Sequence, residues 1–157
     1  HTISGIVNRL FFSVNNGTIR NINFVGKTNS WGALFGDGIG GSSVLENVTA
    51  TITMETSWAL HSSGLYILRQ SSALANFISG GAFVNVNVYV AIPENIGLIG
   101  YESQTTYPLA DISAFGNITA EYLGKATFTN CAAYSNDTSI QFTLGEDNGT
   151  VQGWNQQ

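Results

Sequence analysis

Carboxylates are the side chains in this sequence most capable of acid–base chemistry, and they are spread thinly along it. Cleavage of a polysaccharide needs two or more carboxylates that converge on one face, often with a basic residue. The ten acidic residues are Asp37, Glu46, Glu55, Glu94, Glu102, Asp111, Glu121, Asp137, Glu146 and Asp147. Only the last two are adjacent, in a Gly-rich tail. No catalytic residues are predicted, and a polysaccharide lyase or hydrolase, which would need residues such as Glu55 and Glu121 on one face, is the least favoured function.

Nucleophilic side chains are equally isolated. His61 is the one internal histidine, and Ser62 and Ser63 follow it. A base and a nucleophile that are adjacent in sequence do not by themselves form a triad, and no G-x-S-x-G elbow occurs. Cys131 is the only cysteine, and its apolar setting in "TNCAAY" favours a small buried side chain over a reactive thiol. We therefore expect a protein that is not an enzyme.

Two glycine-rich stretches have the composition of ligand-binding loops. A phosphate-binding loop would need a Lys and a helix start after the glycines, and neither "GDGIGGSS" (residues 36–43) nor "GLIGYES" (residues 97–103) supplies them. Asp37 is the single carboxylate in the first stretch, whereas calcium is held by several oxygen ligands. No metal or cofactor is predicted, and the glycines are expected at tight corners of the chain.

The elements that would position any site follow from two alternating patterns. In the first, a glycine precedes apolar residues, at Gly5, Gly32, Gly64 and Gly97. In the second, an asparagine lies in the sequence apolar-x-Asn-apolar, at Asn21, Asn47, Asn85, Asn117 and Asn130. Apolar residues with period two follow the asparagines, which predicts strands over residues 22–24, 48–54, 86–90 and 118–122.

These five asparagines are predicted to be repeat corners. The apolar residues on either side of each Asn would point to opposite faces of a straight strand, so we expect the chain to bend there. Asn tolerates the left-handed backbone conformation that such a corner needs. In stacked repeats, one corner Asn would lie over the next and form a ladder.

The repeats predict an all-β fold, a parallel β-helix (β-solenoid) of about four or five coils, because stacked coils bury an inner face that one coil cannot. Residues 1–144 would form this single domain, and the Gly/Asn/Gln-rich residues 145–157 a C-terminal strap or linker. The alternative is an antiparallel β-sandwich. Asn16-Gly17 and Asn148-Gly149 are the only Asn-Gly turn pairs that would support it.

Two segments resemble the halves of the GLUG repeat. Residues 97–103 (GLIGYES) and residues 126–134 (ATFTNCAAY) are similar to its two parts, which usually run G-L-V-G-x-N and T-I-x-N-C-x-A. The resemblance implies a bacterial cell-surface or secreted protein, whose repeats form β-rich stalks or adhesive regions. Residues 104–125 separate the halves by more than the usual gap, which implies either an extra coil centred on Asn117 or a convergent likeness.

Composition excludes several other classes of protein. A chain of 157 residues suits one domain, and 43% hydrophobic against 10% charged residues is not the composition of a disordered chain. The net charge is −5 and the five Lys and Arg residues form no run, so nucleic acid is not an expected partner. No apolar run approaches the roughly 18 residues of a membrane span.

Five N-x-S/T sequons make the chain a candidate glycoprotein if it is secreted by a eukaryote. Their asparagines are Asn16, Asn47, Asn117, Asn136 and Asn148. Asn47 and Asn117 are also predicted corners, and side chains that ladder inward there would exclude a glycan.

We expect a non-enzymatic extracellular or cell-surface structural module, either a segment of a stalk or a head-to-tail filament subunit. The N-terminal "HTISGIVNRLFF" has no cap signature, so we expect that end to stack on another copy or on neighbouring repeats. The alternative is a carbohydrate-binding or adhesive module that contacts glycans through outward Tyr and Trp side chains, with Trp31, Trp58 and Trp154 as candidates. The Thr49, Thr51 and Thr53 row is expected to be a solvated strand face.

Overall fold

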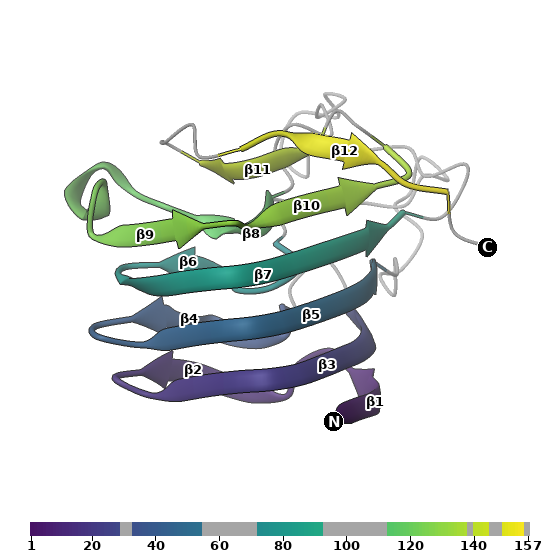
Figure 1. The fold of residues 1–157 in the computed structure, drawn as a ribbon, viewed down its shortest axis with the longest axis horizontal. Helices are drawn as coiled ribbons and strands as arrows, with labels where there is room; N and C mark the ends of the chain where they lie inside the picture. Colours follow the sequence, from purple (N-terminus) through teal and green to yellow (C-terminus); the bar gives the residue numbers. More distant parts are fainter. Residues whose placement is uncertain (29–32, 55–71, 93–112, 138–139, 145–148, 156–157) are drawn as a thin grey trace, which may run out of the picture.

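The computed structural model describes residues 1–28, 33–54, 72–92, 113–137, 140–144 and 149–155, which form an all-β fold of two parallel sheets (Figure 1). Sheet A contains, in spatial order, β1 (Thr2–Val7), β3 (Thr18–Thr28), β5 (Val44–Met54), β7 (Gly81–Ala91), β10 (Ala132–Ser135) and β12 (Val151–Gly153), with β9 (Ala126–Thr129) also paired to β7. Sheet B contains β11 (Gln141–Leu144), β8 (Ser113–Asn117), β6 (Phe77–Ile78), β4 (Phe35–Gly40) and β2 (Phe11–Asn15). A short 3-10 helix, η2 (Ala120–Tyr122), lies between β8 and β9.

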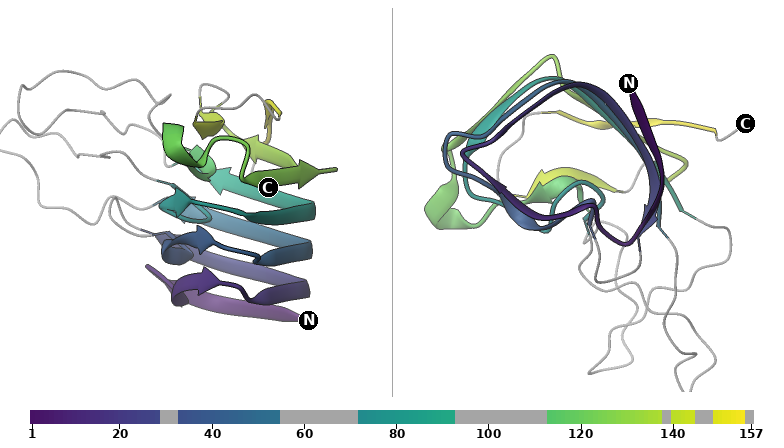
Figure 2. Two further views of the ribbon diagram at one scale, coloured as in Figure 1. Left: turned by 90° about the vertical axis from the view of Figure 1, so that its left-hand side faces the viewer. Right: turned by 90° about the horizontal axis from the view of Figure 1, so that it is seen from below.

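The chain alternates between the two sheets. The sheet B strands β2, β4 and β6 are each followed by a sheet A strand, β3, β5 and β7 in turn, and strands of successive turns lie over one another (Figure 2). Every pairing between the described strands is parallel. The antiparallel sandwich is therefore wrong for this part of the chain. Asn16-Gly17 connects β2 to β3 in the opposite sheet and does not turn a hairpin.

One hydrophobic core lies between the sheets and accounts for the period-two pattern. In β5 every second residue from Val48 to Met54 is fully buried, and the threonines between them are partly exposed. Val86, Val88 and Val90 repeat this pattern in β7. Burial of each of these valine, isoleucine and methionine side chains stabilises the fold by about 1.5–3 kcal/mol, before the cost of ordering it.

Phenylalanine rings fill the core along the direction in which the strands stack. Phe83 stacks on Phe128 with ring centroids 4.7 Å apart, and Phe115 lies 4.4 Å from Phe142. Phe115 also meets Phe83 edge to face at 6.1 Å. Because Phe115 and Phe142 belong to sheet B whereas Phe83 and Phe128 belong to sheet A, this ring cluster joins the two sheets.

The long sheet A strands bend at asparagine. Leu45 and Val48 are both fully buried although they are three residues apart, and Asn47 between them has φ of 53°. The bend turns both apolar neighbours into the core, as the sequence pattern required. Asn21, Asn85 and Asn130 have φ of 56°, 53° and 51°.

The corner predicted at Asn117 is wrong. Asn117 ends β8 in sheet B, where its backbone N–H donates to the carbonyl oxygen of Asn76 at 3.2 Å and so continues the sheet pairing. The strand predicted over residues 118–122 is also wrong, because Ala120–Tyr122 forms η2. No extra coil is centred on Asn117, and the corner of this turn of the chain is Asn130.

The C-terminal segment also differs from the prediction. Residues 151–153, expected within a strap or linker, form β12, and Val151 lies opposite Ala133 of β10. This segment therefore extends sheet A beyond the boundary predicted at residue 144. The GLIGYES stretch at residues 97–103 lies outside the described residues.

Candidate functional site

The corner asparagines form a hydrogen-bonded ladder on the surface. The Asn47 Nδ2 donates to the Asn21 Oδ1 at 3.0 Å, and the Asn85 Nδ2 donates to the Asn47 Oδ1 at 2.9 Å. All three side chains are exposed, so the ladder lies at the edge of the core and not inside it. Its amides are used to join successive turns of the chain, which is a structural role.

Three of the other sequon asparagines are described, and they occupy different settings. Asn16 is exposed, and its Oδ1 accepts from the Ser42 backbone N–H and hydroxyl at 2.9 and 3.1 Å. Asn136 donates to the Ile92 carbonyl oxygen at 2.6 Å and accepts from the Ile92 N–H at 2.8 Å. The Asn117 Oδ1 is buried without a hydrogen-bond partner in the described part of the chain. Asn148 lies outside the described residues.

The outer face of sheet A carries an aromatic cluster at its C-terminal end. Tyr89 and Tyr134 lie opposite each other in register and stack with ring centroids 4.5 Å apart, and Trp154 meets Tyr89 edge to face at 5.3 Å. Because the tyrosines cover one another's faces, they offer a sugar ring little of the flat aromatic surface that a glycan-binding Tyr/Trp cluster would need. Trp31 and Trp58 lie outside the described residues.

The threonine row on β5 does not extend to the neighbouring strands. Thr49 lies opposite Asn23 and Asn87, and Thr51 lies opposite Val25 and Tyr89. The side chains on this face are therefore mixed in type, as expected for a solvated strand face.

Acidic residues do not form a catalytic group in the part of the chain that the structure describes. Asp37, Glu46, Glu121 and Asp137 lie on or beside four different elements, and no group of three metal-ligating side chains occurs among the described residues. Glu46 approaches Arg20 at 3.6 Å, and a hydrogen bond from Tyr122 to Glu121, together with the Glu121 charge, raises the pKa of Tyr122. His61 and Glu55 lie outside the described residues, so the pairing of Glu55 with Glu121 stays untested.

Cys131 has the environment of an unreactive thiol. Its Sγ is half-buried and donates to the backbone carbonyl oxygens of Phe83 at 3.3 Å and Thr129 at 3.4 Å. Burial raises the pKa of the Cys131 thiol, which lowers the thiolate fraction at neutral pH.

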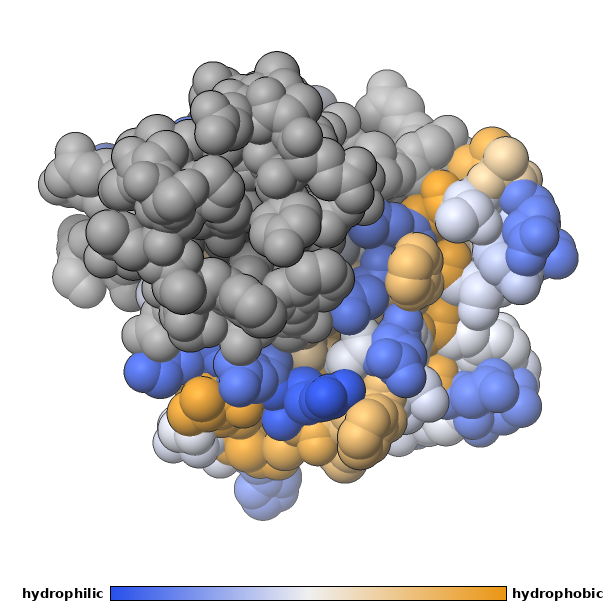
Figure 3. Space-filling view, turned by 180° about the vertical axis from the view of Figure 1, so that it is seen from behind, coloured by the Kyte–Doolittle hydropathy of each residue, from blue (hydrophilic) through white to orange (hydrophobic). Residues whose placement is uncertain are grey.

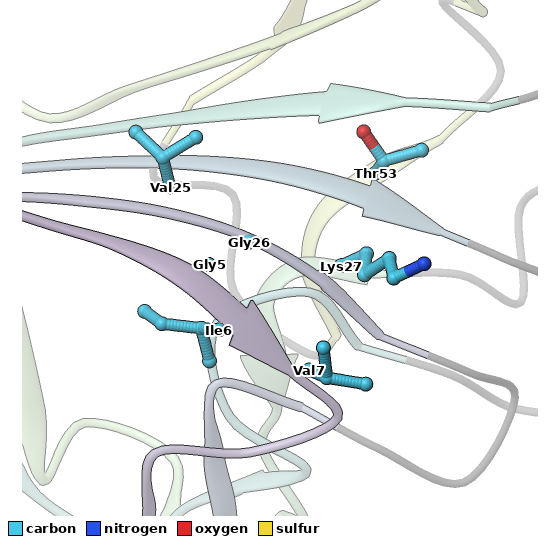
Figure 4. A pocket seen from close by; sticks show the side chains of 7 residues that line it. All are labelled: Gly5, Ile6, Val7, Val25, Gly26, Lys27 and Thr53. Atoms are coloured by element: carbon cyan, nitrogen blue, oxygen red, sulfur yellow. The ribbon is translucent and has the colours of Figure 1, made fainter.

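An open cavity of about 280 Å³ lies beside β1, β3 and β5 (Figure 4). Its lining residues are Gly5, Ile6, Val7, Val25, Gly26, Lys27 and Thr53. Gly26 lets β1 approach β3, because a Cβ there would lie 2.7 Å from the Ile6 Cβ. The Lys27 ammonium group points away from Ile6 and Val25. The lining contains no carboxylate, imidazole or thiol, so this cavity lacks an acid–base pair.

A second, smaller cavity of about 200 Å³ is an open groove on the outer face of sheet B, and we call it the β4 groove. Its lining residues are Ser13, Val14, Asn15, Asp37, Gly38, Ile39, Gly40, Phe77 and Ser79. Unlike the first cavity, it combines a carboxylate, an amide and hydroxyl groups with an aromatic ring. Sequence reasoning missed it, because its residues come from three turns of the chain that only the strand register brings together.

The N-terminal end of the stack is apolar and has open strand edges. Among the described residues, seven large hydrophobic side chains are exposed, and five of them lie within residues 1–28: Ile3, Val7, Phe11, Phe12 and Val25. We call these five the N-terminal patch. β1 and β2 are the terminal strands of their sheets, and orange side chains gather at this lower end in Figure 3.

No protein-family model, curated protein or solved structure matches this chain. The likeness to the GLUG repeat therefore stays a resemblance carried by its own residues. The part of the chain that the structure describes contains no helix of the length and hydropathy needed to cross a membrane.

Proposed function

We propose that this protein is a non-enzymatic structural module of an extracellular or cell-surface stalk or filament, built from coils of a parallel β-helix. Its N-terminal end stacks head to tail on another β-coil. The observation that carries this proposal is the N-terminal patch, which places five exposed apolar side chains at the end of the stack where β1 and β2 each have one edge without a described partner strand.

The chemistry of the edge strands supports stacking. Proteins usually protect an open sheet edge with charged residues or proline. Neither β1 (TISGIV) nor β2 (FFSVN) contains a charged residue or a proline. Arg9, between them, lies over the Phe12 ring at 4.3 Å, and Phe12 is still 69% exposed. An uncharged edge with adjacent apolar side chains favours the addition of further parallel strands.

Regular stacking within the chain supports the β-helix. β5 pairs with both β3 and β7 over nearly its whole length, with the corner asparagines in register. A further coil at the N-terminal end would continue the same ladder of backbone and Asn hydrogen bonds. Such a head-to-tail contact uses two different surfaces and propagates without closing.

Sedimentation velocity across a concentration series, with negative-stain electron microscopy, tests the filament. We expect the wild type to form elongated particles, and the Ile3→Lys/Val7→Lys double variant to remain monomeric because it places two charges on the β1 edge. Leu123→Lys is the matched control, since Leu123 is exposed but distant in sequence from the edge. A natively folded wild type that stays monomeric throughout would overturn the filament proposal.

A further inference from the structure

The β4 groove forms because β4 is rich in glycine and contains one extra residue relative to β2, which is a β-bulge. Its sequence FGDGIG places Gly38 and Gly40 beside Ser13 and Asn15 of β2. Because glycine has no side chain, β4 places none between β2 and β6 at these positions. Side chains of β2 and β6 form the two walls of the groove, and the β4 backbone forms its floor. Gly38 also lets β6 approach, because a Cβ there would lie 2.6 Å from the Phe77 carbonyl oxygen.

A bulge in β4 sets the position of Asp37. Phe11 pairs with Phe35 and Ser13 pairs with Gly38, so β4 advances three residues while β2 advances two. The extra residue lies between Phe35 and Gly38, where Asp37 is exposed. Bulges re-aim side chains from their usual alternation, and here the bulge directs a carboxylate to the rim of the groove.

In the part of the chain that the structure describes, no side-chain hydrogen bond or ion pair occupies the polar groups of the groove. Among the described residues, Asp37 makes no hydrogen bond or ion pair, and no Lys or Arg lines the groove. Ser13 and Asn15 on β2 are exposed, and Ser79 follows β6 on the other wall. Together they offer a carboxylate and an amide oxygen as acceptors, and hydroxyl and amide groups as donors.

Phe77 gives the groove its apolar surface. It is 54% exposed although it lies in a sheet strand, and no other aromatic ring in the described part of the chain packs on it. This differs from Tyr89 and Tyr134, whose faces cover each other. A ring that is more than half exposed and that no described aromatic ring covers, beside hydroxyl-binding groups, suits a ligand that is apolar on one face and polar around its rim.

We propose that the β4 groove binds one uncharged hexopyranose unit of a glycan. The axial C–H groups of the sugar pack on the Phe77 ring, and its hydroxyls donate to the Asp37 carboxylate and to the Asn15 amide oxygen. A hydrogen bond to an ionised acceptor is stronger than one between neutral groups, so Asp37 contributes most of the polar affinity. The groove shares no residue with the N-terminal patch, although both include residues of β2, and its proposal does not depend on filament assembly.

Three other ligand classes fit the groove less well. An anionic sugar would place its charge beside Asp37 with no basic residue to balance it. A metal ion would find one carboxylate where several oxygen ligands are needed. A peptide strand cannot add to β4, because β4 already pairs with β2 on one side and β6 on the other. The volume of about 200 Å³ is also smaller than the roughly 300–1,000 Å³ of sites for drug-sized ligands, which favours a single ring.

The test is a two-dimensional amide NMR titration of the full chain carrying Ile3→Lys and Val7→Lys, which keep it monomeric and lie outside the groove. The ligands are the methyl glycosides of glucose, galactose, mannose and N-acetylglucosamine, with methyl glucuronide as the charged comparison. We expect one or more neutral glycosides to shift the amides of residues 13–15, 37–40 and 77–79, and methyl glucuronide to bind more weakly. Absence of saturable shifts with every neutral glycoside, or shifts confined to the Tyr89 and Tyr134 face, would overturn the proposal.

Variants locate the site. We expect Asp37→Asn to weaken binding roughly tenfold to a hundredfold, and Phe77→Ala to weaken it about tenfold, whereas Glu121→Gln, a remote exposed acid, leaves it unchanged. Ser13→Trp fills the groove without removing a buried side chain, so it abolishes binding in a protein whose fold is intact by circular dichroism. Binding that survives both Asp37→Asn and Ser13→Trp would reject the groove. Asp37 and Phe77 lie outside the terminal strands β1 and β2, so Asp37→Asn and Phe77→Ala should leave filament assembly unchanged. Failure of this proposal and failure of the structural proposal are therefore distinguished.

Discussion

The Asn85 side-chain amide donates to the Asn47 Oδ1 at 2.9 Å, and the two residues share a left-handed backbone with φ of 53°. One residue type thus does two things at each corner. Its short polar side chain lowers the cost of the left-handed conformation, and the same side chain bonds to the next turn of the chain.

Replacing Asn47 separates these two contributions. Asn47→Ala loses both ladder bonds and places an ordinary side chain at φ of 53°, so we expect it to lower the free energy of unfolding by about 2–3 kcal/mol. Asn47→Gly loses the ladder but accepts the backbone conformation, so its loss should be about 1 kcal/mol. Urea denaturation measures both. Equal losses in the two variants would mean that the left-handed backbone contributes nothing to the choice of Asn.

Asn136 is expected to be a structural residue, although it lies in a sequon. Its amide bonds both the N–H and the carbonyl oxygen of Ile92, as a neighbouring strand would. Asn136→Ala leaves two backbone groups of a buried residue unpaired, which should cost about 2 kcal/mol. Thermal unfolding measures the loss, and amide hydrogen exchange at Ile92 should become faster.

Asn136→Asp is the matched control for that variant. It keeps the acceptor for the Ile92 N–H but presents a carboxylate to the Ile92 carbonyl oxygen, so we expect exchange at Ile92 to be slower than in Asn136→Ala. Its melting temperature, compared with that of Asn136→Ala, should rise at low pH, where the carboxyl is protonated and can donate to that oxygen. Unchanged exchange at Ile92 in Asn136→Ala would show that the side chain does not protect that amide.

Local sequence was sufficient for four of the five predicted corners and insufficient where non-local strand pairing decides the backbone conformation. Asn47 and Asn117 lie in the same apolar-x-Asn-apolar pattern, yet only Asn47 is left-handed. Asn117 pairs with Phe77 and Leu144 in sheet B, and this non-local ladder keeps it extended. The β4 groove likewise depends on the register of β2, β4 and β6, which a single sequence does not specify.

Cys131 should react slowly with thiol reagents. Burial raises the pKa of its thiol, so at pH 8 less thiolate is present than in an unfolded peptide, and alkylation by iodoacetamide should be slower than for the urea-unfolded chain. Because the folded pKa lies above the unfolded value, the stability that this thiol contributes is present below the ordinary thiol pKa. It is lost as the pH rises through the folded pKa.

Cys131→Ala removes that dependence on pH. We expect the alkaline fall in melting temperature to be shallower in Cys131→Ala than in the wild type, while Ala resembles the buried thiol closely enough to keep the fold. An alkaline fall of the same size in both proteins would assign it to other groups.

Phe115 is expected to be among the most sensitive positions in the core, because its ring joins the two sheets. It is fully buried and contacts Phe83, Phe128 and Phe142. Phe115→Ala should lower the free energy of unfolding by about 3–5 kcal/mol, through lost burial and the cavity left among three rings.

Two control variants test this explanation. Phe115→Leu fills most of the cavity and should lower the free energy of unfolding by less than half as much. Leu123→Ala, at an exposed position, should lower it by about 0.5 kcal/mol or less. Urea denaturation of the three variants gives the order. A Phe115→Ala protein as stable as Leu123→Ala would mean that the sheets do not depend on this ring cluster.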